Sequence, residues 1–530
     1  MRRTLAGIAL AVGTAGPAAA AGPSAWIQCD GLPKPETVGS ALGRVVAISA
    51  TAGLFGMPEA IRAEPAARGE VGVKACDTVL AELPAQPLSP RRVSALRARA
   101  IHKAEAGDLD AALVDLQSIH GAVVEEGQTT IFARTLGASA QLFEAAVLAK
   151  RGRHEEAEAL AIKAADSRPY STALGHAAAR ILSVDPRWTA EKDRVLTRLV
   201  SIDPEARLVR AELREAGGPI EAAAADWALV AAQGPGPAQG ADALLAELVR
   251  PLMVGRAAVV AARAGREVEA RRLLAGATVP APAPRGRKPD PRLVELKAKM
   301  SGAVAERMQT FVPLVDAWLS AGGDAAAAKA KLESVASPPA IPSVAALMDR
   351  LTPQTGAGAQ TFSEQLRLSE RRDNAEKLDV LKIANTLPLL EGGSAGANSF
   401  SSQGMLGLKA NGFKDRAVKG SDARTIEFVG ANSPQAAVEE MMLLRAAQLA
   451  AQAGKAGFLV TGRRDYRQQL VSTMYGAEVS RSNAGFKSEA DVVFVDPAAI
   501  PAAYAGQADR VLDAQAVWAA LSPVYVKPKT

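Results

Sequence analysis

Cysteine, histidine and aromatic residues are scarce in this 530-residue sequence, which has two cysteines, four histidines and 4% aromatic residues. A core with so few aromatic rings must be packed from Ala, Leu and Val, which favours helix packed on helix. An excess of one charge is also missing, because 62 Lys and Arg against 56 Asp and Glu leave a net charge of +6. A dedicated nucleic-acid-binding protein would carry a concentrated basic face, so no nucleic-acid partner is expected. With 48% hydrophobic residues the chain is predicted to fold, into about two to four domains.

Uninterrupted apolar runs of membrane-spanning length are absent after residue 20. At the start, Met1-Arg2-Arg3 precedes the apolar run Leu5 to Ala20, and Ala18 to Ala21 offer A-x-A cleavage registers. This order is typical of a secretory signal peptide, here residues 1–21. A retained membrane anchor is the alternative, but the run is shorter than the ~20 residues that span a bilayer. We therefore expect a periplasmic protein with no transmembrane segment after signal cleavage.

The two cysteines, Cys29 and Cys76, both lie near the predicted mature N-terminus. An even pair in an oxidising compartment predicts one disulfide, and closing a loop of this size stabilises a fold by about 4 kcal/mol in the chain-entropy model. A metal or redox pair is the alternative, but the C-x-x-C spacing and a nearby histidine are missing. Residues 22–90 are therefore expected to form a disulfide-linked helical segment. Gln28 precedes Cys29 where a lipoprotein signal has a small residue, so lipidation is not expected.

The middle of the chain carries a recurring helical pattern. In residues 96–119, LRARAIHKAEAGDLDAALVDLQSI, small Ala100 lets a first helix approach closely and Gly107 interrupts the chain. A second helix then buries a stripe of residues at helical spacing, Ala112, Leu116 and Ile119. Similar turns recur more faintly along the chain, at Gly152, Gly218, Gly265 and Gly323.

These paired helices resemble a degenerate tetratricopeptide repeat. The glycines are spaced more widely than the roughly 34 residues of a regular repeat, and Lys103 and Leu148 stand where a Tyr is usual. The resemblance implies an α-solenoid over residues 91–277 and 291–351, with an extended surface that binds a protein partner. An irregular Ala-rich helical domain is the alternative.

Two segments are predicted to be linkers. Residues 278–290 are too rich in proline for a helix, and their basic residues are expected to be solvated. Residues 352–403 are polar and are expected to form a flexible linker. Within them, Glu364 to Asp379 is a candidate solvated helix and Gly392 to Ser402 a flexible hinge.

Residues 404–530 change to an alternating pattern. Ile426 and Phe428 lie on one face of a predicted half-buried strand, Ala423 to Gly430. Ser433 and Pro434 are expected to begin a helix that ends at Gly454, with Ser433 as N-cap. Further strands at 458–461 and 492–495 and a final helix near 511–518 predict a small two-layer α/β domain.

This C-terminal order resembles a family of small proteobacterial envelope lipoproteins of unknown function. The resemblance covers roughly residues 404–522, in the stretches FVGANSPQAAVEEMMLLRAAQLAAQAGKAGFLVTG, ADVVFVDP and VLDAQAVWAAL. It implies an envelope location and a fold but no reaction. Family members carry a lipidated N-terminal Cys, which this chain lacks. The matching residues are Gly430, Asn432, Leu443, Leu444, Arg445, Ala446, Ala447, Asp513, Ala514 and Val517.

No catalytic motif is found. The four histidines all precede residue 177, so the C-terminal domain has none for a Ser-His-Asp or Cys-His site, and no G-x-S-x-G or H-E-x-x-H occurs. Ser480 or Ser482 with Lys487 leaves a Ser-Lys arrangement open, without an S-x-x-K motif to support it. No catalytic residue, metal site or cofactor is therefore predicted.

One cluster is a candidate binding site. Arg463, Arg464, Tyr466 and Arg467 follow a predicted strand, in what is expected to be a long loop. Arg and Tyr are enriched at interface hot spots, and guanidinium groups suit carboxylate or phosphate. A solvated basic loop is the alternative.

Together these observations predict a mostly α protein, a TPR-like α-solenoid followed by a small two-layer α/β domain. The leading functional hypothesis is a secreted, non-enzymatic scaffold that binds a protein partner through its helical repeats. Two alternatives stay open. One is a cell-envelope hydrolase with a carboxylate or Ser-Lys site. The other is a module that associates with anionic lipid or cell-wall polymer at the envelope surface through Arg463, Arg464 and Arg467.

Overall fold

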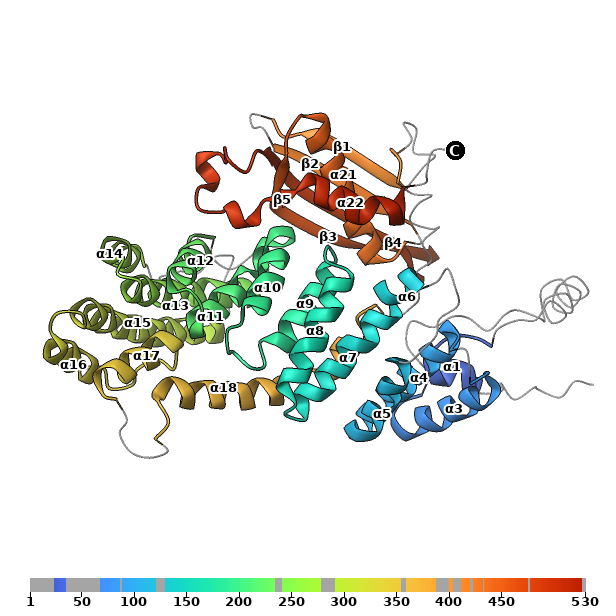
Figure 1. The fold of residues 1–530 in the computed structure, drawn as a ribbon, viewed down its shortest axis with the longest axis horizontal. Helices are drawn as coiled ribbons and strands as arrows, with labels where there is room; N and C mark the ends of the chain where they lie inside the picture. Colours follow the sequence, from blue (N-terminus) through green and yellow to red (C-terminus); the bar gives the residue numbers. More distant parts are fainter. Residues whose placement is uncertain are drawn as a thin grey trace, which may run out of the picture. The chain divides into compact units, whose positions relative to one another are not determined.

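The computed structural model shows a mostly helical chain with a small antiparallel sheet near its C-terminus, as predicted (Figure 1). It divides into two compact units, Met1–Val123 and Val124–Thr530. The structure describes residues 23–34, 67–85, 88–120, 129–233, 241–277, 291–353, 359–387, 400–403, 411–419, 423–431, 433–474 and 477–526. The predicted signal peptide and the Pro-rich linker 278–290 lie outside the described residues, as does most of the predicted hinge from Gly392 to Ser402.

The first unit is built around the predicted disulfide. Its helices are α1 (Ala25–Asp30), α3 (Gly69–Glu82), α4 (Pro90–Glu105) and α5 (Leu109–His120). A bond between Cys29 in α1 and Cys76 in α3 confirms the cysteine pairing, and both residues are fully buried. His102 of α4 is also buried, with Nε2 2.8 Å from the Cys29 carbonyl oxygen. The disulfide and this hydrogen bond therefore join three helices.

The second unit begins with a succession of helices. They are α6 (Thr129–Arg134), α7 (Leu136–Lys150), α8 (His154–Ser167), α9 (Thr172–Leu182), α10 (Ala190–Ile202), α11 (Arg207–Gly217), α12 (Ile220–Gln233), α13 (Ala241–Arg263), α14 (Glu267–Gly276), α15 (Pro291–Ser320), α16 (Ala325–Glu333) and α17 (Pro342–Leu351). Figure 1 shows them packed side by side in chain order, with neighbours in contact.

The helix pairs predicted from the turn glycines are confirmed. The glycines lie between α4 and α5, α7 and α8, α11 and α12, α13 and α14, and α15 and α16, and each pair packs together. Gly107, Gly152 and Gly265 have φ of 86°, 79° and 72°, a left-handed conformation that a side chain would strain. The helical pairing is thus established, and the tetratricopeptide resemblance stays a prediction.

Within the predicted linker 352–403, the candidate helix Glu364 to Asp379 is confirmed, but this part of the segment is docked on the helical array and is not a flexible tether. Residues 359–387 of the linker contain α18 (Phe362–Lys377) and α19 (Val380–Ala384). Helix α19 buries an apolar stripe and packs on α7. Helix α18 is anchored by polar contacts, since Arg367 donates to Asp185 at 3.0 Å and Asn374 to the Ser183 carbonyl at 2.9 Å. These partners are about 190 residues earlier in the chain, so composition alone could not reveal them.

The C-terminal sheet has the order β1-β2-β4-β3-β5, with each neighbouring pair antiparallel. Its strands are β1 (Gly412–Ala417), β2 (Ala423–Gly430), β3 (Gly457–Met474), β4 (Ala477–Val495) and β5 (Leu512–Asp513), and its helices are α21 (Gln435–Gln452) and α22 (Ala514–Tyr525). The predicted buried face of β2, Ile426 and Phe428, is confirmed and packs against α21. The predicted Ser433 N-cap is wrong, because Pro434 takes that position and no side chain caps the helix.

The α/β domain shares its core with the helical array. Apolar side chains of α9, α10 and α11, among them Leu196, Leu199 and Leu213, belong to the same buried cluster as α21, α22 and one face of the sheet. Figure 1 shows the sheet and its helices lying over α9 and α10. The expectation of a separate module on a flexible tether is therefore wrong. The two parts fold around a common apolar core.

Two adjacent glutamates of α21 join the array at the centre of this contact. Glu440 is fully buried, with its carboxylate 2.7 Å from Arg134 and 3.1 Å from Arg168, and it accepts a hydrogen bond from Tyr525. Burial alone would raise the pKa of Glu440, but Arg168, Arg134 and the hydrogen bond from Tyr525 hold it below its ordinary value. The carboxylate therefore stays charged inside the core.

The Glu440→Gln variant is expected to lose about 3 kcal/mol of unfolding free energy, because Arg134 and Arg168 would be left buried without a counter-charge. Urea unfolding followed by circular dichroism measures this loss. Glu333→Gln is the matched control, since the Glu333 side chain is 66% exposed. It should change stability by less than about 0.5 kcal/mol.

The difference in unfolding free energy between wild type and Glu440→Gln is expected to depend on pH. Since the pKa of Glu440 is lowered by folding, its stabilising effect is complete above the unfolded pKa of about 4.3 and is lost as the pH falls through the folded value. The stability difference between wild type and Glu440→Gln should hold above about pH 5 and shrink in acid. A difference that grows in acid would contradict the ion-pair account.

Candidate functional site

The predicted binding cluster lies in a strand and not in a loop. Residues 463–467 belong to β3, which pairs with β4 along almost its whole length. Side chains alternate between the two faces of a strand, so Arg463 and Arg467 point to one face and Arg464 and Tyr466 to the other. The structure therefore separates the four residues into two pairs.

Arg463 helps to hold the sheet against the helical array. Its side chain is 5% exposed, and its guanidinium lies 3.3 Å from Glu439 of α21 and 2.8 Å from Asp465. Burial alone would lower the pKa of Arg463, but Glu439 and Asp465 raise it. Glu439 also accepts hydrogen bonds from the backbone and hydroxyl of Thr172, the first residue of α9. Arg463 is thus committed to structure and is not free to bind a ligand, whereas Arg467 is exposed.

Arg464 and Tyr466 lie on a polar face of the sheet where charges of both signs alternate. Arg464 contacts Glu489 at 2.8 Å and Asp491 at 3.1 Å. Lys487 bonds Glu489 at 3.2 Å, and its ammonium lies 4.8 Å from the centre of the Tyr466 ring. Because these cations already have carboxylate partners, this face is a weak candidate for an anionic lipid or polymer.

Lys487, the lysine of the Ser-Lys alternative, lies on this same face of the sheet. Burial would lower the pKa of Lys487, but Glu427 and Glu489 raise it above its ordinary value. A lysine that acts as general base needs a lowered pKa, so Lys487 is poorly suited to that role. The side chains of Ser480 and Ser482 lie outside the described residues.

A more promising site is a groove on the helical array, formed by two adjoining pockets of about 250 and 530 Å³. Both are lined by Ser183, Val209, Glu212 and Asn374, so the pockets are continuous. We call this feature the α9–α11–α18 groove, after the helices that contribute to both of its halves. Apolar residues line much of it: Ala179, Leu182, Leu196, Val209 and Leu213.

One end of the groove has more cations than carboxylates, the carboxylate there being Asp379, which caps the start of α19. Arg180 of α9, Lys377 of α18 and Lys382 of α19 line it and are exposed. Within the described part of the chain, no carboxylate forms an ion pair with any of the three. His176 lies at the same end, 2.7 Å from Asp203. Cations without partners beside an apolar surface can bind an acidic, partly apolar chain segment.

The other end carries carboxylates around Arg256 of α13. Glu215 is buried, bonds the Arg256 guanidinium at 2.8 Å and accepts from the Ser343 backbone at 3.1 Å. Burial raises the pKa of Glu212, and the neighbouring Glu215 adds to this. Its side chain is 48% exposed, so water screens part of the effect. Burial likewise raises the pKa of Glu370. These two carboxyl groups are the candidates for proton transfer.

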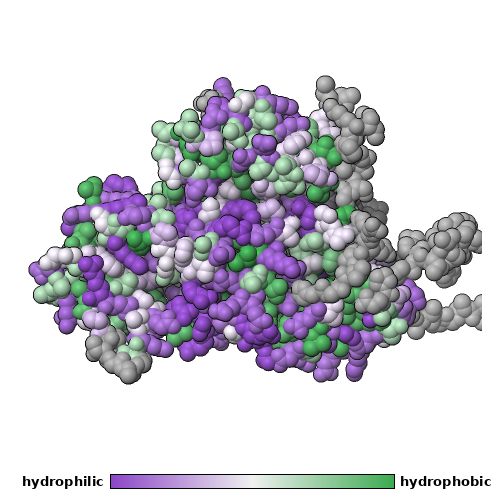
Figure 2. All heavy atoms as spheres, viewed as in Figure 1, coloured by the Kyte–Doolittle hydropathy of each residue, from purple (hydrophilic) through white to green (hydrophobic). Residues whose placement is uncertain are grey.

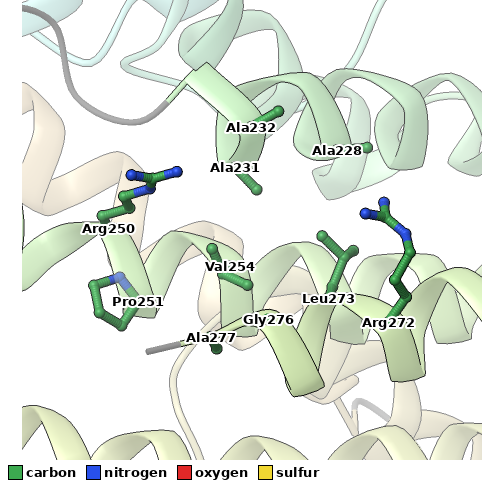
Figure 3. Close-up of a pocket in the computed structure, with 10 residues that line it drawn as sticks. All are labelled: Ala228, Ala231, Ala232, Arg250, Pro251, Val254, Arg272, Leu273, Gly276 and Ala277. Atoms are coloured by element: carbon green, nitrogen blue, oxygen red, sulfur yellow. The ribbon is translucent and has the colours of Figure 1, made fainter. Parts of the chain in front are cut away.

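A third pocket, of about 340 Å³, lies between α12, α13 and α14 (Figure 3). Figure 3 shows Arg250 and Arg272 on either side of the pocket, with Ala231 of α12 across it from Val254 and Leu273. Among the described side chains, no carboxylate lines this pocket. It lacks the paired titratable groups of the α9–α11–α18 groove, which is therefore the stronger candidate.

Sequence reasoning missed the groove entirely. Glu212, Arg256 and Glu370 are on α11, α13 and α18, and nothing in their local sequence marks them. Only the docking of α18 in the segment predicted to be a linker brings them together. The helix from Glu364 to Asp379 was predicted, but its docking was not, because α18 has no buried residue and its anchors Arg367 and Asn374 look like ordinary surface residues in the sequence.

The division of the 463–467 cluster can be tested with two matched variants. Arg463→Ala should lower the unfolding free energy by about 3–5 kcal/mol, because it leaves Glu439 buried without its cation. Arg467→Ala, on the same strand but exposed, should change it by less than about 0.5 kcal/mol. Urea unfolding distinguishes the two. Equal effects would show that both arginines have the same role.

Among the described residues, no three His, Cys, Asp or Glu side chains gather as a metal site requires, and no helix is long and apolar enough to span a membrane. Comparison of the chain with protein-family models, with curated proteins and with solved structures finds no match. The residues of the groove are thus the basis for a functional proposal.

Proposed function

We propose that this protein is a non-enzymatic adaptor of the bacterial periplasm that binds a segment of a protein partner in the α9–α11–α18 groove. The observation that carries the proposal is the continuity of the groove, which joins an apolar floor to a basic end. Helical arrays commonly present extended surfaces of this kind to protein partners. The predicted signal peptide and the Cys29–Cys76 disulfide support a secreted location.

The chemistry of the groove defines the segment it would bind. Apolar side chains of the partner would cover Val209 and Leu213, and an acidic residue would face Lys377 and Lys382. In this arrangement the apolar contact supplies most of the affinity, whereas the lysines set orientation and association rate. The α/β domain supports the array through their shared core.

The proposal can be tested by site-specific photo-crosslinking in the native cells. A photo-reactive residue at position 209 of the full-length chain should capture a partner, and the Lys377→Glu/Lys382→Glu double variant should reduce capture about tenfold or more. Arg372→Glu is the matched control on the same helix, since Arg372 is 78% exposed and does not line the groove.

The control should retain the crosslink. Circular dichroism should show that all variants fold, so that lost capture reports on the groove itself. Undiminished capture by the double variant would contradict the proposal.

A second candidate function, an envelope hydrolase, is favoured by Glu212 and Glu370. Both line one pocket, and burial raises the pKa of each, the direction that general-acid catalysis requires, while the charge of Arg256 opposes this rise. Arg256, 3.1 Å from Glu212, would stabilise negative charge on a substrate or on the second carboxylate.

This candidate predicts release of soluble fragments from purified peptidoglycan sacculi. Glu212→Gln and Glu370→Gln should each abolish release, and activity should fall as the pH rises through the raised pKa of the acid. Glu221→Gln, whose side chain is 63% exposed, should leave release unchanged. No release by the wild type would eliminate peptidoglycan as the substrate.

A further inference from the structure

A separate polar pocket of about 390 Å³ lies where the start of α8 meets α18. Three segments far apart in sequence line it: residues 152–156 at the α7–α8 turn, residues 185–187 after α9, and Arg367 and Arg371 of α18. Figure 1 shows α18 passing the ends of α8 and α9, and Figure 2 shows mostly hydrophilic residues on the face over α18. The pocket shares none of its lining residues with the α9–α11–α18 groove.

The cations of this pocket fall into two classes. Arg153 is fully engaged, because two of its nitrogens bond Glu156 at 2.7 and 2.6 Å. Arg367 is engaged too, with two bonds to Glu364 and two to Asp185. The hydrogen bonds to these carboxylates account for both guanidinium groups, so neither arginine is a candidate for binding a ligand.

Arg187 and Arg371 differ from them. The guanidinium of Arg187 lies 3.7 Å from Glu155, and that of Arg371 lies 3.9 Å from Asp185. Both distances exceed a hydrogen bond. Their side chains are partly exposed, 46% and 32%. Two guanidinium groups therefore present unused N–H donors to one pocket.

His154 supplies a third group with unused capacity. Its Nδ1 atom is buried and has no hydrogen-bond partner within the described residues. Burial lowers the pKa of His154, and the charge of Arg371 lowers it further. The charged side chains around this ring are Arg153, Arg187, Lys192, Arg367, Arg371, Asp185, Glu155 and Glu156. In the tautomer that carries the proton on Nδ1, and in the imidazolium, this nitrogen lacks an acceptor.

One further feature favours an anion here. His154 is the first residue of α8, a helix of 14 residues whose N-cap, Arg153, supplies no side-chain acceptor. The first-turn N–H groups at a helix N-terminus carry a partial positive charge. They add to the donors of Arg187, Arg371 and His154, although Glu155 and Glu156 in the same turn offset part of this charge.

We propose that this pocket binds a phosphoryl group, with Arg187, Arg371 and the imidazole of His154 as its three donors. A tetrahedral dianion has enough acceptor oxygens for all three, and guanidinium forks match phosphate geometry. The two oxygens of a carboxylate lie in one plane, whereas the oxygens of a phosphoryl group point in three directions and can face donors from three segments. The bound group would connect α8, the segment after α9 and α18 through one ligand. The proposal does not depend on the adaptor function.

Histidine NMR on the full-length protein tests the proposal directly. Inorganic phosphate should raise the pKa of His154, because a bound anion stabilises the imidazolium. His176 serves as internal reference, since it pairs with Asp203 and does not line this pocket. Sodium acetate at matched ionic strength should leave His154 unshifted.

Variants of the two arginines test whether the phosphate binds in this pocket. Arg187→Gln/Arg371→Gln should weaken phosphate binding about tenfold or more, because two charge-assisted hydrogen bonds are lost. Arg194→Gln is the control, since Arg194 is 49% exposed, bonds Asp166 and lies outside the pocket. Circular dichroism confirms that each variant folds.

The outcomes are distinct. Equal binding of inorganic phosphate and glycerol phosphate would assign the site to the phosphoryl group itself, and tighter binding of the ester would narrow the ligand to a phosphate monoester. An unshifted His154, a shift produced equally by acetate, or a shift that survives Arg187→Gln/Arg371→Gln would overturn the proposal.

Discussion

The buried charges of Glu439 and Glu440 are the constraint on which the second unit depends. These neighbouring residues lie on one buried turn of α21, yet they contact different elements. Glu440 binds Arg134 and Arg168 of the helical array, and Glu439 contacts Arg463 of the sheet and the start of α9. Removing charges from water is costly, and only a complete set of partners offsets the loss. The α/β domain can therefore pack on the array in one arrangement, since a shift would leave a buried charge without its partner.

Apolar contact surrounds this polar centre and supplies most of the driving force. The aliphatic side chains of α9, α10 and α11, mostly Leu, Val and Ile, pack against the sheet and its helices, which suits a chain with few aromatic residues. The polar contacts then determine the orientation of surfaces that apolar packing alone would leave less specific. The result is a helical array that carries its C-terminal domain as part of one core.

Helix α18 organises the exposed side of the array in a similar way. It docks through Arg367 and Asn374, and it supplies residues to both the α9–α11–α18 groove and the pocket beside α8. Both candidate sites thus depend on the same helix, whose anchors are polar and partly exposed. A helix held by such contacts can respond to a ligand more readily than one held by a buried apolar face.

The sequence by itself determined the local features of this protein. Its helix pairs, the turn glycines between them and the strand from Ala423 to Gly430 follow from short-range periodicity, and the pairing of Cys29 with Cys76 follows from the presence of only two cysteines. These features depend on backbone conformation and on spacing along a single segment, which local sequence encodes directly.

Tertiary structure alone decided where the charges act. The cluster from Arg463 to Arg467 was predicted to be one binding loop, but strand pairing with β4 divides it between two faces. Residues 364–379 were predicted to be a solvated helix within a linker, but partners about 190 residues away make this helix a docked wall of the groove. A charged residue has the same local signature whether it faces water or a buried partner. Its role is therefore set by which distant side chain the fold places within a few ångströms.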